Sequence, residues 1–370
     1  MDSELKKTVR RIDLLRGALI VTLVLYILVA LIINSEYLTA DRIRRARSDV
    51  AWALRSKNTD ILLDGETTLD VKLFQDGCAV LSRNGIAVYS SGGNKYNAFT
   101  LRYSDPRLVT GDRWILCYDR GGNDWCLMDT FRILCSGTEA EPIISGAVSD
   151  DGYFALATEK FEYKGCVTVY NTKGTALARW NSDTYLTDVL FTSENRATVI
   201  SLLSEKERIS TVFSLFDFRE GKILSSATAP DTIPYGVAVK DGKVEMLASS
   251  GSWLFDGTAV TAVRPYRDAV PGRFFQGSEA TMINYPAADV TEVFSADGQE
   301  LFTSDLPGVV SLSCYRDFYF FLCEDALWVL DGAGQVREQY PCDASAVYAS
   351  PETVLLRTRS GVTHFGLTSD

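Results

Sequence analysis

The longest uninterrupted apolar stretch lies near the start of the chain, from Gly17 to Ile33, and it contains neither a charged residue nor a proline. With a rise of about 1.5 Å per residue, a helix that also includes Leu14, Leu15 and Arg16 is roughly 30 Å long, enough to cross the hydrocarbon core of a bilayer. The Arg16 side chain can reach back toward the lipid headgroups. The pattern therefore predicts a transmembrane helix over 14–35.

A buried core helix and a cleaved signal peptide are the two alternatives for this stretch. No second long helical pattern exists that could bury it, and the run is longer than the apolar region of about 7–15 residues in cleaved signals. An uncleaved signal anchor is the favoured interpretation. The residues assigned to this membrane anchor include Arg16, Gly17, Leu25, Ile33 and Tyr37.

The orientation of the anchor follows from the basic residues on each side of it. Five Lys or Arg residues flank its start, and four follow its end at a greater distance. Because the side with the nearer positive charge usually stays inside, we expect 1–13 to form a cytoplasmic tail. This predicts a single-pass protein of the cell membrane whose remaining chain lies outside the cell.

Directly after the anchor, 36–58 shows a short helical pattern. Ile43, Ala46, Val50 and Leu54 recur at helical spacing, with arginines mostly off that stripe. The segment is predicted to be a juxtamembrane helix, which either rests on anionic headgroups or serves as a plain stalk.

From about residue 66 the helical period gives way to short alternating strands separated by turns that are rich in Gly, Asp, Asn and Ser. An apolar or aromatic residue ends one strand of each repeat, and the mean spacing between these markers is about 39 residues, which suits four short strands and their turns. The eight marker residues are Tyr89, Met128, Tyr170, Phe216, Phe255, Phe294, Leu330 and Phe365.

The period predicts an all-β fold, an eight-bladed β-propeller over 59–370, with seven blades as the alternative. A sandwich or a barrel competes, but some 300 residues of evenly spaced strands are too many for one sandwich. The first four blades are expected over 66–104, 105–141, 142–182 and 183–232, the fourth with an insertion near Ser204–Arg208.

The last repeat has room for only three strands, AVYAS, TVLLRTR and VTHFGL. An open ring would expose the edges of its terminal strands. We therefore expect Ile61–Leu63, which lies just ahead of the first blade, to supply the missing strand and close the ring.

Charge and composition narrow the function classes. The chain has 48 acidic and 37 basic residues and a net charge of -11, which argues against nucleic acid as the main partner. A single histidine, His364, removes most histidine-based catalysis and most zinc chemistry. Glycine-rich phosphate-binding loops and a GxSxG serine elbow are both missing from the sequence. No catalytic residue, metal ligand or cofactor is therefore predicted.

The eight cysteines include no CxxC pair, so a zinc ribbon or a thioredoxin-type site is not indicated. A turn at Gly121–Gly122 would set Cys117 opposite Cys126, and a turn at Thr130–Phe131 would set Cys126 opposite Cys135. The same spacing across Phe318–Tyr319 would set Cys314 opposite Cys323. Disulfides are possible outside the cell, but we favour free thiols buried as small apolar side chains.

Two further features have a structural and a functional interpretation. Asp-Gly pairs at 241–242, 256–257, 297–298 and 331–332 suggest calcium, but they stand one per turn, where hairpins favour this dipeptide. Arg120 lies in the turn CYDRGGNDW and is either a solvated turn residue or a contact on a propeller face.

Some stretches resemble a known family: Trp114–Gly122 (WILCYDRGG), Gly152–Gly174 (GYFALATEKFEYKGCVTVYNTKG) and the later Asp-Gly hairpins. On these residues the chain resembles the domain of unknown function 5711 family of Gram-positive Firmicutes, and the similarity extends over nearly the whole chain. The resemblance implies a short basic N-terminus, one membrane helix and an extracytoplasmic propeller. It implies no activity, and the high cysteine content departs from what we expect of the family.

Three functions remain open. The first, which we favour, is a protein-interaction or scaffold module that binds other cell-envelope proteins and is not an enzyme. The second is a propeller enzyme or a binder of a cofactor or glycan, such as a quinone-dependent dehydrogenase, and it rests on fold analogy alone. The third is a ligand sensor that signals through a membrane partner, because the cytoplasmic tail is too short for an output domain.

Overall fold

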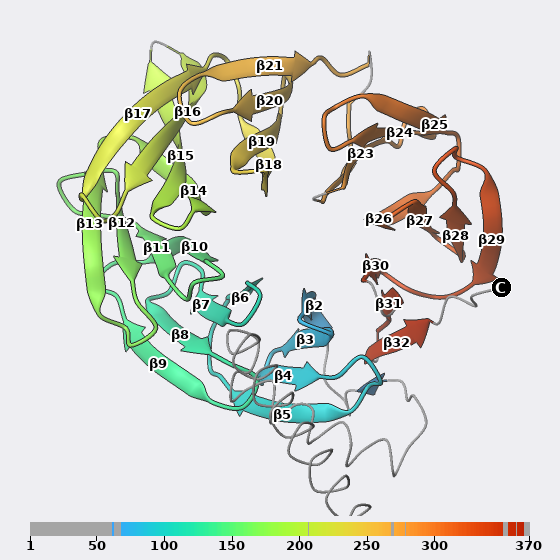
Figure 1. Cartoon of the computed structure of the whole chain (residues 1–370), viewed down its shortest axis with the longest axis horizontal. Helices are drawn as coiled ribbons and strands as arrows, with labels where there is room; N and C mark the ends of the chain where they lie inside the picture. The colour runs from blue at the N-terminus through green and yellow to red at the C-terminus, as the bar shows by residue number, and fades with distance from the viewer. Residues whose placement is uncertain are drawn as a thin grey trace, which may run out of the picture. The chain divides into compact units, whose positions relative to one another are not determined.

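The computed structural model describes residues 61–62, 68–205, 207–267, 270–277, 279–350, 354–359 and 361–365. These residues form 32 strands in eight four-stranded antiparallel sheets. The sheets stand side by side around a central axis, with the first strand of each sheet innermost (Figure 1). The predicted all-β, eight-bladed propeller is confirmed, and the alternative of seven blades is wrong.

Four blades make up the first half of the ring. The first comprises β2 (Thr68–Phe74), β3 (Gly77–Ser82), β4 (Gly85–Tyr89) and β5 (Lys95–Thr100). The second comprises β6 (Pro106–Thr110), β7 (Ile115–Asp119), β8 (Asp124–Met128) and β9 (Ile133–Thr138). The third comprises β10 (Ile143–Val148), β11 (Phe154–Thr158), β12 (Gly165–Tyr170) and β13 (Ala176–Ser182). The fourth comprises β14 (Tyr185–Ser193), β15 (Arg196–Glu205), β16 (Arg208–Asp217) and β17 (Lys222–Ala229).

The second half follows the same plan. The fifth blade comprises β18 (Pro234–Lys240), β19 (Lys243–Ala248), β20 (Gly251–Phe255) and β21 (Val260–Arg264). The sixth comprises β22 (Arg273–Gln276), β23 (Ala280–Tyr285), β24 (Val290–Ser295) and β25 (Glu300–Ser304). The seventh comprises β26 (Val309–Tyr315), β27 (Phe318–Cys323), β28 (Ala326–Leu330) and β29 (Val336–Pro341). The eighth comprises β30 (Ala346–Ala349), β31 (Val354–Arg357), β32 (Gly361–Phe365) and β1 (Ile61–Leu62).

The ring closes through its first strand. β1 is the outermost strand of the eighth blade, with Ile61 opposite Val362 and Leu62 opposite Gly361. Ile61 is only 2% exposed and packs in the apolar cluster between the eighth and first blades. The expected closing strand is thus confirmed, and it covers the edge of β32 that would otherwise be open.

The core lies between neighbouring blades rather than in one central mass. The middle strands β3, β4, β7, β11 and β12 are buried at every position, because neighbouring blades cover both of their faces. The outer strands, such as β5 and β29, alternate between more and less exposed positions. All eight predicted marker residues lie in the third strand of their blade.

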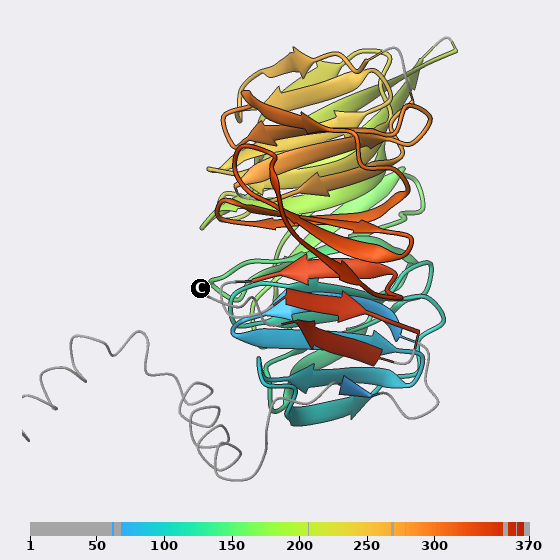
Figure 2. The ribbon, with the colours of Figure 1, turned by 90° about the vertical axis from the view of Figure 1, so that its right-hand side faces the viewer.

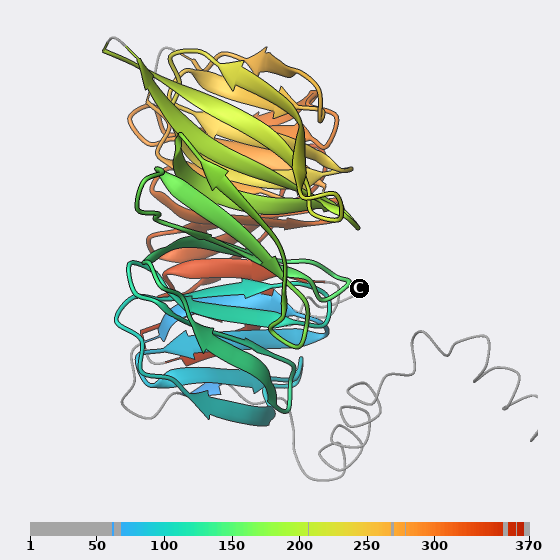
Figure 3. The ribbon, with the colours of Figure 1, turned by 90° about the vertical axis from the view of Figure 1, so that its left-hand side faces the viewer.

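The predicted insertion near Ser204–Arg208 is the end of the longest hairpin in the described chain. β15 and β16 have ten residues each, and their pairing continues to Glu205 opposite Arg208. Figures 2 and 3 show this hairpin, in yellow-green, reaching beyond the neighbouring blades. The insertion therefore lengthens an existing hairpin and adds no new strand to the sheet.

The cysteine registers were predicted only in part. Cys117 lies opposite Cys126, as expected. Cys126 lies opposite Ser136 and not Cys135, because a β-bulge near the start of β9 shifts the register by one residue. Cys314 lies opposite Tyr319 and not Cys323, because the hairpin turns at 316–317, earlier than predicted. All eight thiols are free.

The predicted helices over 14–35 and 36–58, with Arg16, Gly17, Leu25, Ile33 and Tyr37, lie outside the described residues. Within the described part, no helix is long and apolar enough to cross a membrane.

Candidate binding site on one face of the ring

The order of the strands gives the ring two distinct faces. The turns between second and third strands, and the connections from one blade to the next, all lie on one face, because the four strands of each blade alternate in direction. We call this the connection face. The turns between first and second strands, and between third and fourth strands, lie on the opposite face.

A pocket of about 550 Å³ opens on the connection face between the third and fourth blades. This volume is within the usual range of small-ligand sites. The β11–β12 turn forms one wall, and the beginnings of β10 and β14 form the other. The lining residues are Ile144, Glu159, Lys160, Tyr163, Lys164, Tyr185 and Leu186.

Backbone hydrogen bonds fix both ends of the β11–β12 turn. The Glu159 N–H donates to the Pro142 carbonyl at 3.0 Å, and the Lys164 N–H donates to the Ser182 carbonyl at 2.9 Å. The turn thus holds Phe161 at its apex with 80% of its surface exposed. Tyr163 and Tyr185 are 44% and 54% exposed beside it. Phe161 and Tyr163 are therefore presented to solvent by a turn that is anchored on both sides, and Tyr185 is presented by the start of β14.

The pocket carries charges of both signs. The Lys164 ammonium lies 4.7 Å from the centre of the Tyr185 ring, a favourable cation–π distance. Among the residues that the structure describes, neither Lys160 nor Lys164 forms an ion pair. Glu159 is the one acidic residue in the lining. The lining thus contains two ammonium groups and one carboxylate.

Arg120 also lies on the connection face, in the β7–β8 turn of the second blade. The Arg120 guanidinium contacts Asp105 at 2.8 Å and is about half exposed, and Arg107 binds the same carboxylate at 3.2 Å. Burial is the largest single effect on Asp105 and opposes its ionisation, but the hydrogen bonds and the charges of the two arginines together outweigh it and hold its pKa below the usual value. The next turn residue, Gly121, donates its N–H to Ile143 at 2.8 Å, directly before the pocket residue Ile144. A contact of Arg120 with a ligand stays a prediction.

Beside the pocket, two polar side chains on the first strands of neighbouring blades form a hydrogen bond. The Ser145 hydroxyl donates to the Asp188 carboxylate at 3.3 Å, and the Tyr118 ring lies against the neighbouring Gly146. Burial raises the pKa of Asp188 to about 6. β-bulges at Ile143/Ser145 and at Leu186/Asp188 locally change the alternation of side chains along both strands. Within the described residues, no group of three or more His, Cys, Asp or Glu side chains could hold a metal ion.

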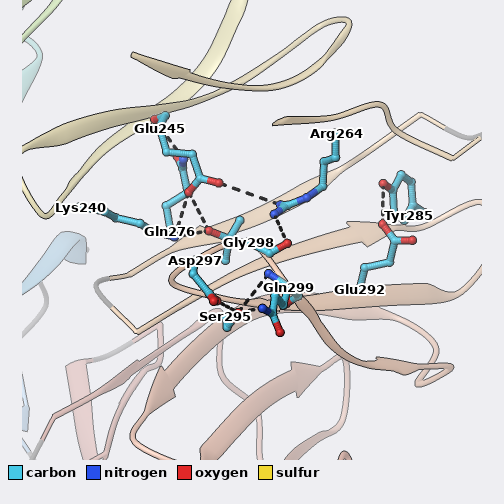
Figure 4. Close-up of polar contacts among 11 residues, drawn as sticks. Lys240, Glu245, Arg264, Gln276, Tyr285, Glu292, Ser295, Asp297, Gly298 and Gln299 are labelled. Carbon is cyan, nitrogen blue, oxygen red and sulfur yellow. Dashed lines mark hydrogen bonds and ion pairs between the residues drawn. The ribbon is translucent and has the colours of Figure 1, made fainter. Parts of the chain in front are cut away.

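A second polar cluster joins the fifth and sixth blades. Lys240 forms an ion pair of 2.9 Å with Glu245, both side chains being less than a tenth exposed (Figure 4). The buried hydroxyl of Thr281 donates to the same carboxylate at 2.8 Å. Arg264 lies 4.0 Å from Glu245 and 3.7 Å above the Phe294 ring. Figure 4 also shows Tyr285 directed toward Glu292, to which its hydroxyl donates at 3.0 Å.

The apolar contact at this blade interface is correspondingly small. Its buried cluster contains only Leu247, Ile283, Tyr285 and Phe294, whereas the clusters at the other interfaces contain eight to eleven buried residues. This polar interface was not predicted from the sequence. A signal was present, because Glu245 in VEMLA and Glu292 in VTEVF are acidic residues inside otherwise apolar strands.

Comparison with known proteins places the chain in a family. A sequence model described as a family of unknown function, DUF5711, matches residues 55–260, which is more than half of the chain. The chain belongs to this family. The match confirms the predicted membership of DUF5711, while the bacterial group named with it stays a prediction. No curated protein matches the chain.

Similar solved structures agree with the fold. The computationally designed Ika8 protein aligns with a TM-score of 0.63 at 13% identity, over 83% of this chain and 99% of that one. BamB from Moraxella catarrhalis aligns with a TM-score of 0.58 at 13% identity, over 84% and 98% of the two chains. The C-terminal WD40 domain of Sif2 aligns with a TM-score of 0.60 at 9% identity, over 84% and 97%. At such identities the likeness shows the β-propeller fold alone.

Proposed function

We propose that this DUF5711 protein is a membrane-anchored interaction module that binds other cell-envelope proteins through the connection face of its propeller. The observation that carries the proposal is the aromatic group Phe161, Tyr163 and Tyr185, exposed around one pocket. Aromatic side chains that protrude from a fixed backbone are typical energetic centres of protein interfaces. Their exposure in water is unfavourable and is relieved when a partner covers them.

Further apolar residues extend this surface into the fifth blade. Ile233 and Tyr235, at the start of β18, are 42% and 53% exposed on the same face. Tyr235 packs with Phe274 of the sixth blade at 6.0 Å between ring centres. The connection face thus exposes apolar residues at more than one blade, and a protein partner of ordinary size covers an area of that extent.

The membrane part of the proposal rests on the sequence. The uncharged run Gly17–Ile33 supports a single-pass anchor, and the basic residues around its start support a cytoplasmic N-terminus with an extracellular propeller. An anchor would concentrate the connection face near other envelope proteins. Protease added to intact cells should digest the propeller, and protection of the propeller would contradict this orientation.

The docking surface can be tested by cross-linking in living cells. A photoreactive residue at position 161 should capture a discrete protein neighbour, and the double substitution Phe161→Ser and Tyr163→Ser should remove that neighbour from the purified protein. Leu177→Ser is the matched control, because Leu177 is similarly exposed at 45% on the outer strand of the same blade. Equal recovery of the same proteins with both variants, or capture of lipid alone, would contradict the proposal.

A ligand sensor is the second candidate function, favoured by the pocket volume of about 550 Å³. In that case a small molecule would occupy the site, and a membrane partner would carry the signal inward. Thermal-shift measurements of the full chain with wall fragments and sugars would separate the two functions, because stabilisation by one of these envelope molecules is expected for the sensor and not for a module that binds proteins.

A further inference from the structure

The apolar and the charged side chains of the pocket between the third and fourth blades are arranged differently, and this arrangement indicates what the pocket binds. Tyr163, Tyr185, Ile144 and Leu186 supply rings and aliphatic surface. The charged side chains of the lining come from the β11–β12 turn alone, at consecutive positions Glu159 and Lys160 and then at Lys164. An occupant would therefore meet apolar and aromatic surface on both walls, and charge on the turn side alone.

The charge of the lining is opposite in sign to that of the whole chain. Two ammonium groups and one carboxylate leave the lining with an excess of positive charge, in a chain whose net charge is -11. Within the described part of the chain, Lys160 and Lys164 have no ion-pair partner, so no carboxylate of the protein occupies their donors. The partly buried Asp188 is hydrogen-bonded to Ser145 and does not belong to the lining.

The position of Lys164 adds a second requirement that a ligand has to meet. Its ammonium lies 4.7 Å from the Tyr185 ring centre, and both groups border the same space. A ligand group that bonds this ammonium thus lies beside an aromatic ring. Charge-assisted hydrogen bonds to such an ammonium are strongest with carboxylate or phosphate oxygens.

We infer that the pocket recognises a carboxylate carried on an apolar body, with the carboxylate bound by Lys160 and Lys164 and the apolar body against Tyr163 and Tyr185. This inference rests on the proposed function, since it specifies what a partner presents at the connection face. The carboxylate belongs to an acidic side chain next to an apolar residue in a partner protein, because Phe161 is exposed outside the pocket lining, where a larger partner can also cover it.

The test uses the full chain in lipid nanodiscs and two probes, N-acetylphenylalanine and its neutral amide. The carboxylate probe should bind at least about tenfold more tightly than the amide, measured by ligand-observed NMR titration. Lys160→Gln and Lys164→Gln should each weaken binding of the carboxylate probe several-fold. Glu159→Gln should strengthen it, because this substitution removes the one repulsive charge from the lining. Lys173→Gln, on the opposite face of the same blade, should leave the affinity unchanged.

The direction of these changes in affinity decides whether the inference holds. Equal binding of the two probes, weaker binding after Glu159→Gln, or no binding of either probe would overturn it. Failure of the proposed function looks different, because cross-linking at position 161 would then yield no protein neighbour even if the probe binds. A blocked peptide with the sequence Glu-Phe distinguishes a protein partner from a free small molecule. Tighter binding of this peptide than of the free acid supports a protein partner, and the reverse, a preference for the free small molecule, would overturn that assignment.

Discussion

At the scale of single residues, Asp188 is the acidic group whose surroundings most clearly disfavour its charge. The partly buried carboxyl accepts one hydrogen bond, from Ser145, and its desolvation raises its pKa from 3.8 to about 6. A folded-state pKa above the unfolded value gives stability that is complete below about pH 4 and is lost as the pH rises through 6. We therefore expect Asp188 to destabilise the propeller at neutral pH.

The prediction compares Asp188→Asn with the wild type. The substitution removes the titration, so the free energy of unfolding of the variant relative to the wild type should rise between pH 4 and 7 by at most about 3 kcal/mol, and then stay constant. Denaturant unfolding of both proteins at each pH measures this difference, in which the other titrating groups cancel. A difference that does not change with pH would show that Asp188 titrates normally.

Residue-level features differed in how far the sequence could predict them. Ile61 as the start of the closing strand followed from a count of strands, and Cys117 opposite Cys126 followed from a two-glycine turn. Asp188 was not predicted from the sequence, because its surroundings depend on contact with another blade, including Ser145, which lies 43 residues earlier in the chain. Arg120 was predicted only as a turn residue, either solvated or in contact with a ligand on a propeller face, and its partner Asp105, which belongs to another connection, was not predicted.

At the scale of elements, the interface between the fifth and sixth blades is unlike the others. It replaces part of the usual apolar contact with the ion pair of Lys240 and Glu245 and the hydroxyl of Thr281. A buried ion pair contributes little relative to apolar residues of the same size, but loss of one partner leaves an uncompensated charge. The strands β18, β19 and β23 thus depend on both charges being present.

Lys240→Met should therefore destabilise the protein by about 3 kcal/mol, because the buried Glu245 would lose its cation at 2.9 Å and keep only Arg264, at 4.0 Å. The double variant Lys240→Met and Glu245→Leu should recover most of this loss. Lys222→Met is the control, because Lys222 pairs with Glu220 on the exposed surface, and it should leave the unfolding midpoint unchanged. Chemical denaturation measures all three variants. Equal stability of Lys240→Met and the wild type would show that water reaches the Glu245 carboxylate.

Strand positions were predictable because the alternation and the turn residues are local signals. All four blades with predicted boundaries contain their strands within those boundaries. Register was less predictable. One extra residue in β9 moved Cys135 out of line with Cys126, and the early turn at Arg316, which has a φ of 52°, did the same for Cys314 and Cys323. Such bulges and turns are set by packing between blades, which the sequence of one hairpin does not contain.

At the scale of the whole propeller, stability depends on closure, because each blade buries its faces only against its two neighbours. The eighth blade has three strands from the end of the chain and one from the beginning, so the two ends of the propeller sequence are held in one sheet. Without β1, the edge of β32 would be unpaired and the apolar cluster between the eighth and first blades would lose Ile61.

Two truncated chains test this dependence. One begins at residue 59 and keeps β1, and the other begins at residue 68 and lacks it. The shorter chain should lose at least about 2–5 kcal/mol of stability, the usual cost of removing a buried isoleucine side chain, because Ile61 is only 2% exposed. It should also self-associate in size-exclusion chromatography, since the free edge of β32 can pair with a second copy. A synthetic peptide of residues 59–67 should reverse both effects by restoring the missing strand. A monomeric chain from residue 68 with an unchanged melting temperature would mean that seven complete blades and three strands close the ring without β1.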